Sequence, residues 1–193
     1  MMDKKTIVED IIQKEWVMFD KVNNEGGRAS CQNNYPTFHI MRQSQFLAWN
    51  EKMLESYLRD LENAKAEGRN LLTEKYAYMM ESTYPEEYEK IKNVLPVVSQ
   101  EKMDMIEEIS AIYMKQTEEF AAEYPRYMTR TRPVHSKDDK YFTSIETYLK
   151  CELKTYSENT VKEYVEYLKE LDKEGKKIVY MIFENTVKCY GYD

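Results

Sequence analysis

SQEKMDMIEEISAIYMKQTEEFAAEY, residues 99–124, is the longest stretch of the chain in which apolar side chains recur at intervals of three and four. This spacing is typical of a helix with one apolar face. The face consists of Met103, Ile106, Ile109, Tyr113, Phe120 and Tyr124. Because Ser99 is a typical N-cap and Pro125 interrupts the pattern, the sequence predicts a long central helix between these two residues.

On the N-terminal side of the central helix, the same spacing predicts five shorter helical segments, over residues 7–22, 36–49, 50–68, 70–82 and 83–95. Their boundaries are residues that commonly begin or end helices. Asn50 and Asn70 are placed as N-caps, and Gly68 takes the position of a C-terminal glycine. Thr83 and Glu86 have the spacing of a capping box.

Residues 125–140 follow the central helix, lack helical periodicity and are predicted to form a long exposed loop. A capping box from Thr143 to Glu146 then opens one helix, and Ser157 begins another that ends at Gly175. Residues 176–190 contain β-branched side chains, but their apolar positions step by three and four, which favours a helix over a strand. The chain is therefore expected to be all-α, a single domain over residues 1–193 with about eight helices packed as an irregular bundle.

The composition excludes several classes of protein. Glycine (5) and proline (5) are both scarce, which disfavours a turn-rich β protein. The longest apolar run, residues 178–183, is far shorter than the roughly 20 residues of a membrane span. Acidic residues occupy the region where a signal peptide would be apolar, so we expect neither a membrane partner nor export. Cys31, Cys151 and Cys189 lack CxxC spacing, which favours a reducing cytoplasm over disulfides or a zinc cluster.

Charge and histidine content restrict the partners further. The formal net charge of -7 opposes binding to nucleic-acid phosphates, so no nucleic-acid partner is predicted. Neither His39 nor His135 has a second histidine or a cysteine three or four residues away, so no histidine-based metal site is predicted. The glycine pair at residues 26–27 has neither of the spacings found in nucleotide-binding loops, and no cofactor is expected.

The segment NNEGGRASCQ, residues 23–32, is the leading candidate for a functional site because it gathers polar side chains around two adjacent glycines. Such glycines permit positive φ and a close approach of the backbone to a ligand. The predicted ligand-binding residues are Asn23, Asn24, Glu25, Gly26, Gly27, Arg28, Ser30, Gln32, Arg42 and Arg69. They favour a non-catalytic binding or accessory protein that recognises an anionic small molecule or a protein partner. The alternative is structural: the asparagines and glycines end the first helix, and Glu25 pairs with Arg28 inside the loop.

An enzyme with hydrolase or transferase chemistry is the second hypothesis. Cys31 follows Arg28 by three residues, and a nearby guanidinium lowers the pKa of a thiol and makes it nucleophilic. Glu74 and Glu81 are seven residues apart, on one helix face, as acid–base chemistry would need. Each has an ordinary alternative, because free cysteines are commonly buried and glutamates commonly lie on solvated helix faces. A third hypothesis is a structural protein that dimerises through an exposed apolar helix face.

Five blocks of the sequence together resemble an uncharacterised bacterial family, domain of unknown function 4125. The blocks are NNEGGRASCQ, SQF at Ser44–Phe46, EGRNLLTEKYAYMMES, ETYLKCELKTYS and YGYD, and the resemblance extends from about Glu15 to Tyr192. It implies a bacterial origin and a free-standing cytoplasmic protein. It implies no activity, because the family has none that can be transferred to residues of this chain.

Overall fold

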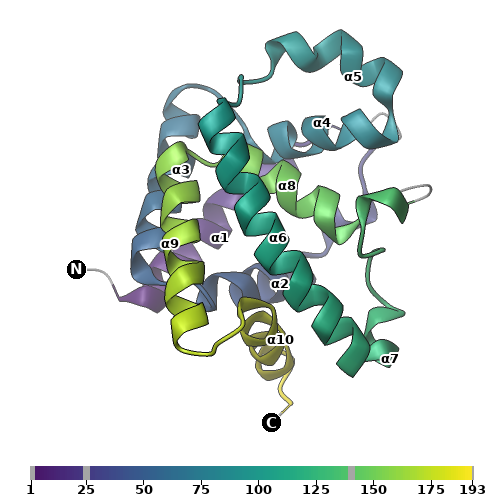
Figure 1. Cartoon of the computed structure of the whole chain (residues 1–193). Coiled ribbons are helices and arrows are strands. Elements are labelled where there is room, and N and C mark those ends of the chain that lie inside the picture. The colour runs from purple at the N-terminus through teal and green to yellow at the C-terminus, as the bar shows by residue number, and fades with distance from the viewer. Residues whose placement is uncertain (1–2, 24–26, 139–141, 193) are drawn as a thin grey trace. The chain divides into compact units, whose positions relative to one another are not determined.

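The computed structural model describes residues 3–23, 27–138 and 142–192 (Figure 1). Within these ranges the chain forms ten α-helices and three short 3-10 helices, and no strand. The all-α prediction is therefore confirmed, and the number of helices is close to the expected eight. No helix in the described ranges is both long and apolar enough to cross a membrane.

The helices group into two compact units. The first unit comprises Met1–Thr73 and Lys169–Asp193, and the second comprises Glu74–Leu168. Each unit has buried apolar side chains of its own. The organisation of the chain as one domain stays a prediction.

The first unit is built around α1 (Lys4–Asp20), which packs against both α2 (Tyr35–Leu47) and α3 (Glu51–Ala66) (Figure 1). The last helix, α10 (Ile178–Cys189), packs against α2. The most deeply buried apolar side chains of this unit include Ile11, Ile12, Phe46, Trp49 and Leu54. Burying a large aliphatic or aromatic side chain contributes about 1.5–3 kcal/mol to the free energy of unfolding. The burial of these side chains therefore holds α1 against its neighbouring helices.

The predicted ends of α3 and the start of α4 (Leu71–Thr83) are confirmed. The side chain of Asn50 accepts a hydrogen bond from the backbone N–H of Met53 at 3.0 Å. Gly68 ends α3 with φ +72, a conformation that side chains with a Cβ rarely adopt. The side chain of Asn70 accepts hydrogen bonds from the backbone of Leu72 and Thr73, and so caps α4.

The second unit is centred on α6 (Gln100–Glu123), the long helix predicted from the sequence, which packs against α8 (Ile145–Thr155). Ser99 caps α6 through the backbone N–H of Lys102 at 3.1 Å. The remaining elements are α5 (Pro85–Ile91), η2 (Lys92–Val94), α7 (Pro125–Met128), η3 (Ser136–Asp138) and the first part of α9 (Glu158–Lys173). Ser157 caps α9 by accepting from Thr160 N–H at 3.2 Å, and Gly175 lies just after its end, as predicted.

Both predicted capping boxes are wrong in detail. Thr83 lies in the last turn of α4, where its hydroxyl donates to the carbonyl of Met79. The N-cap of α5 is Tyr84, whose side chain makes no capping hydrogen bond. The N-cap of α8 is Ser144 instead of Thr143, because the Ser144 hydroxyl accepts from the backbone of the third helical residue. The predicted loop at residues 125–140 is interrupted by α7 and η3, whose three or four residues are too few to produce a periodic apolar pattern.

Candidate functional site

Arg28, from the predicted binding segment, makes its contacts within the chain. Its Nη2 atom donates to the carboxylate of Asp20 at 2.5 Å and to the carbonyl of Gln32 at 2.7 Å. Its Nε atom donates to the Asn33 side chain at 2.8 Å. The guanidinium thus joins the end of α1 to η1 (Ser30–Asn33). Asn24, Glu25 and Gly26 lie outside the described residues.

Gln32 closes the same end of α1. Its side chain is buried, and its Nε2 atom donates to the carbonyls of Phe19 at 2.8 Å and Val22 at 2.9 Å. Its Oε1 atom accepts from the backbone N–H of Ala29 at 2.9 Å. The Phe19 carbonyl also accepts from the backbone N–H of Val22 at 3.1 Å. Gln32 adds a side-chain donor to both carbonyls at the end of α1 and so contributes to its C-terminal cap. Asn23, Gly27 (φ +84), Ser30 and Cys31 are exposed on the surface.

Arg42 is buried in an ion pair inside the first unit. Its Nε and Nη2 atoms each donate to the carboxylate of Glu15 at 2.6 Å, and the Tyr57 hydroxyl donates to the same carboxylate at 2.6 Å. Nη1 donates to the Gln45 side chain at 2.9 Å, and the guanidinium lies 4.7 Å from the centre of the Phe46 ring. Arg42 is thus neutralised by a residue that interrupts the apolar stripe of α1.

The catalytic candidates have different surroundings. Cys31 is exposed, while His39 pairs with Glu9 at 2.7 Å. On α4, Glu74 is buried whereas Glu81 is exposed, so the two carboxylates do not share one solvated surface. The enzyme hypothesis stays a prediction. Among the described residues, no three histidine, cysteine, aspartate or glutamate side chains are grouped so that they could hold a metal ion.

A second buried polar centre lies in the second unit, between α4 and α8. Lys75 donates to the Tyr148 hydroxyl at 2.8 Å, and its ammonium lies 3.5 Å from a carboxylate oxygen of Glu152. The Tyr156 hydroxyl donates to the other carboxylate oxygen at 2.7 Å. Burial, reinforced by the charge of Glu152, raises the pKa of Tyr113 to about 12. These groups satisfy one another within the unit and line neither of the two pockets described below.

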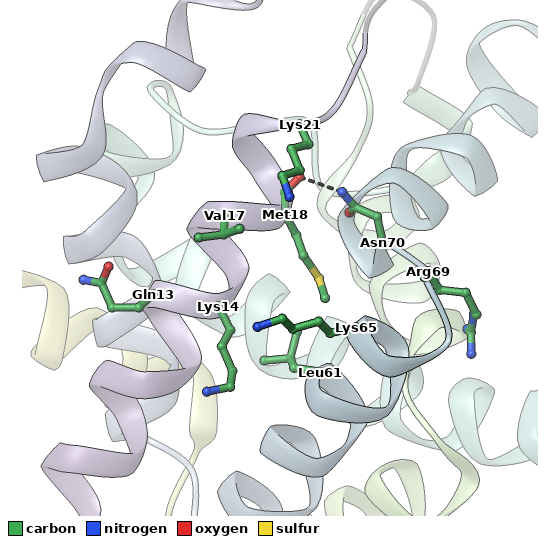
Figure 2. Close-up of a pocket in the computed structure, with 10 residues that line it drawn as sticks. Gln13, Lys14, Val17, Met18, Lys21, Leu61, Lys65, Arg69 and Asn70 are labelled. Atoms are coloured by element: carbon green, nitrogen blue, oxygen red, sulfur yellow. Dashed lines mark hydrogen bonds between the residues drawn. The ribbon is translucent and has the colours of Figure 1, made fainter.

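A pocket of about 380 Å³ lies between α1, the end of α3 and the turn that leads into α4 (Figure 2). All of its lining residues belong to the first unit. They are Gln13, Lys14, Val17, Met18, Lys21, Leu61, Lys65, Gly68, Arg69 and Asn70. Of the described residues that were predicted from the sequence to bind a ligand, Arg69 alone is in this set.

The walls of this pocket, called the α1–α3 pocket below, combine apolar surface with positive charge. Met18 and Leu61 supply buried apolar side chains, and Figure 2 shows Met18 pointing into the space between the two helices. Lys14 and Lys65 direct their ammonium groups into the same space, whereas Arg69 extends away from it. None of the lining residues that the structure describes is acidic.

The cationic side chains of the α1–α3 pocket differ in whether they pair with an acidic side chain. Lys14 pairs with Asp10 on its own helix at 2.5 Å. Arg69 pairs with Glu67 at 2.9 Å. Lys21 and Lys65 have no acidic partner in the part of the chain that the structure describes. These two ammonium groups are therefore available to an anion that enters the pocket.

Hydrogen bonds fix the positions of the pocket walls. The Asn70 side chain donates to the carbonyl of Met18 at 2.8 Å and so ties the turn before α4 to the last turn of α1 (Figure 2). Gln13 donates to Glu9 at 2.9 Å and to the Tyr35 hydroxyl. Hydrogen bonds from Gln13 and His39 hold the pKa of Glu9 below its usual value. The pocket is thus largely formed before any ligand binds, as is usual for small-molecule sites.

Comparison with known proteins identifies the family and nothing beyond it. The family model described as a protein of unknown function (DUF4125) matches residues 5–193, and the chain belongs to that family. No curated protein and no solved structure matches the chain.

Proposed function

We propose that this member of the DUF4125 family is a non-catalytic binding protein for a small organic anion that carries an apolar group. The proposed site is the α1–α3 pocket. The observation that carries the proposal is the pairing of Lys21 and Lys65 with the apolar side chains of Met18 and Leu61, in a pocket without an acidic lining residue. A cytoplasmic location, favoured by the three free cysteines, is part of the same proposal.

The two kinds of wall would select for two parts of a ligand. An anion about 4 Å from an ammonium group gains about 1 kcal/mol in water and about 4 kcal/mol at the effective dielectric constant near a protein surface. Each methylene group removed from water adds about 0.8 kcal/mol. A ligand with one anionic group and a short hydrocarbon chain uses both contributions, whereas an inorganic anion or a neutral hydrocarbon uses one. The pocket volume of about 380 Å³ lies within the usual range for small-molecule sites, roughly 300–1,000 Å³.

The chemistry of the lining residues favours binding over catalysis at this position. None of the ten carries a thiol, a hydroxyl, an imidazole or a carboxylate. These are the groups that most often serve as nucleophiles and general bases. The proposal therefore assigns the pocket to recognition and uses neither Cys31 nor the glutamates of α4.

Isothermal titration calorimetry with octanoate, 1-octanol and acetate tests the proposal. Octanoate is expected to bind more tightly than acetate, which lacks the chain, and than 1-octanol, which lacks the charge. Lys65→Met is expected to weaken octanoate binding by roughly tenfold, the equivalent of about 1.4 kcal/mol. Lys52→Met removes a lysine from the same helix outside the pocket and serves as the matched control. Equal affinities for octanoate and 1-octanol, or equal effects of the two substitutions, would contradict the proposal.

A further inference from the structure

The second unit contains a pocket of its own, with a volume of about 340 Å³. Its walls come from α4, α5, the segment that joins α5 to α6, the first turn of α6, and α8. The side chains used in the argument below are Tyr78, Glu81, Tyr88, Met103 and Lys154. Unlike the α1–α3 pocket, it presents charges of both signs.

The two central charges form an open ion pair. The Nζ atom of Lys154 lies 3.5 Å from a carboxylate oxygen of Glu81. Charge-assisted hydrogen bonds between an ammonium and a carboxylate are usually about 2.7–2.9 Å long, so this contact is loose. The side chain of Glu81 is 59% exposed, which leaves its carboxylate accessible from the solvent. Each member of the pair can therefore take a second partner of opposite charge.

Neighbouring contacts hold the walls of this pocket in place. The Tyr78 hydroxyl donates to the carbonyl of Pro96 at 2.7 Å and so anchors the segment between α5 and α6. Lys102 donates to the carbonyl of Lys154 at 2.7 Å, and the Lys154 ammonium lies 5.4 Å from the centre of the Tyr78 ring. Burial, together with the negative charge of Glu81, raises the pKa of Tyr88 further above physiological pH, so this phenol adds no charge to the pocket.

We propose that this pocket binds a free α-amino acid, with its ammonium group on Glu81 and its carboxylate on Lys154. An α-amino acid carries opposite charges on adjacent carbon atoms. It can therefore lie beside the Glu81–Lys154 pair, whose charged atoms are 3.5 Å apart, with each of its charges next to the opposite charge of the protein. A simple amine or a simple carboxylate would satisfy only one of the two protein charges. The rings of Tyr78 and Tyr88 and the side chain of Met103 provide contacts for an uncharged amino-acid side chain.

This site does not depend on the proposed function, because all of its lining residues belong to the second unit and none lines the α1–α3 pocket. The choice of an amino acid over an anion follows from the presence of Glu81 beside Lys154. An anion alone would meet repulsion from the Glu81 carboxylate, and an amine alone would meet repulsion from Lys154.

The test compares glycine, L-leucine and L-phenylalanine with two matched leucine analogues, by saturation-transfer NMR and calorimetry on the full chain. The analogues are 3-methylbutylamine, which lacks the carboxylate, and 4-methylpentanoate, which lacks the ammonium group. Leucine is expected to bind, and both analogues are expected to bind at least about tenfold more weakly than leucine. Failure of all three amino acids to bind, or binding of either analogue as tightly as leucine, would overturn the proposal.

Substitutions identify the site of binding. Glu81→Gln and Lys154→Met are each expected to weaken amino-acid binding by about tenfold. Lys90→Met, on α5 outside the pocket, is the control and is expected to leave the affinity unchanged. Because Glu81 is exposed, Glu81→Gln reports on the site even if Lys154→Met impairs folding. Unchanged affinity in Glu81→Gln would refute the assignment.

Discussion

The buried ion pair between Glu15 and Arg42 should make the first unit strongly sensitive to loss of the carboxylate. Glu15→Ala removes the carboxylate that accepts two hydrogen bonds from the buried guanidinium of Arg42, while the hydrogen bond from Nη1 to Gln45 can remain. It also removes the acceptor of the Tyr57 hydroxyl. Breaking a buried pair by removing one partner costs about 3–5 kcal/mol in free energy of unfolding. We expect a loss in this range for Glu15→Ala.

Comparison with a double replacement separates the loss of one charged partner from the loss of the whole ion pair. Replacing both partners, as Glu15→Leu with Arg42→Met, removes the two charges together, and such replacements are often neutral or stabilising. The double variant is therefore expected to be more stable than Glu15→Ala. Tyr57→Phe, which removes a single hydrogen bond to a charged group, is expected to cost about 1.5–3 kcal/mol.

Tryptophan fluorescence during urea unfolding measures these differences in the first unit. Both tryptophans of the chain, Trp16 and Trp49, lie in that unit. The reasoning is refuted if Glu15→Ala costs less than about 1 kcal/mol, the size expected of an exposed pair. It is also refuted if the Glu15→Leu/Arg42→Met double variant is less stable than Glu15→Ala.

Three further predictions follow from the cap of α1 and from the pKa values. Gln32→Ala removes a buried side-chain donor from the carbonyls of Phe19 and Val22 at the end of α1 and is expected to lower the free energy of unfolding by about 1–3 kcal/mol in the same fluorescence assay. Because the pKa of Tyr113 is raised from 10.0 to about 12, the unfolded chain releases this proton at a lower pH than the folded chain does. The free energy of unfolding should therefore fall by about 1.4 kcal/mol per pH unit as the pH rises between those two values. Urea unfolding followed by circular dichroism should show a weaker dependence of that free energy on pH in Tyr113→Phe. Hydrogen bonds from the backbone N–H of Ser136, and then from Lys150, hold the pKa of Glu146 below 4.5. The ionised Glu146 carboxylate therefore stabilises the folded chain above pH 4.5, and this stabilisation is lost as the pH falls through the lowered pKa. Acid unfolding of Glu146→Gln should lack this loss of stability.

The positions at which helices begin and end were predictable because caps are local interactions. The Asn50, Asn70 and Ser99 caps each join a side chain to a backbone N–H two or three residues further along the chain. The two displaced capping boxes show the limit of this argument. When two hydroxyl residues are adjacent, as at Thr143 and Ser144, sequence spacing does not decide which one caps the helix.

The charged groups could not be placed from the sequence, because their partners lie far along the chain. Glu15 and Arg42 are 27 residues apart, and neither has a local pattern that indicates the other. Lys65 lies in the last turn of α3 and Lys21 is the C-cap residue of α1. Lysine is common at both positions for the unrelated reason that it complements the helix dipole. Their convergence on one pocket depends on how α1 packs against α3, which periodicity alone does not specify.

The central claim, that the α1–α3 pocket binds an anion with an apolar chain, is tested most directly by NMR of the protein labelled at its methionine methyl groups. The chain has twelve methionines. Met18 lines the pocket, and Met53 is a buried methionine outside it. Addition of octanoate is predicted to shift the Met18 signal, assigned through Met18→Leu, and to leave the Met53 signal unchanged. An unchanged Met18 signal at octanoate concentrations that saturate binding would contradict the account.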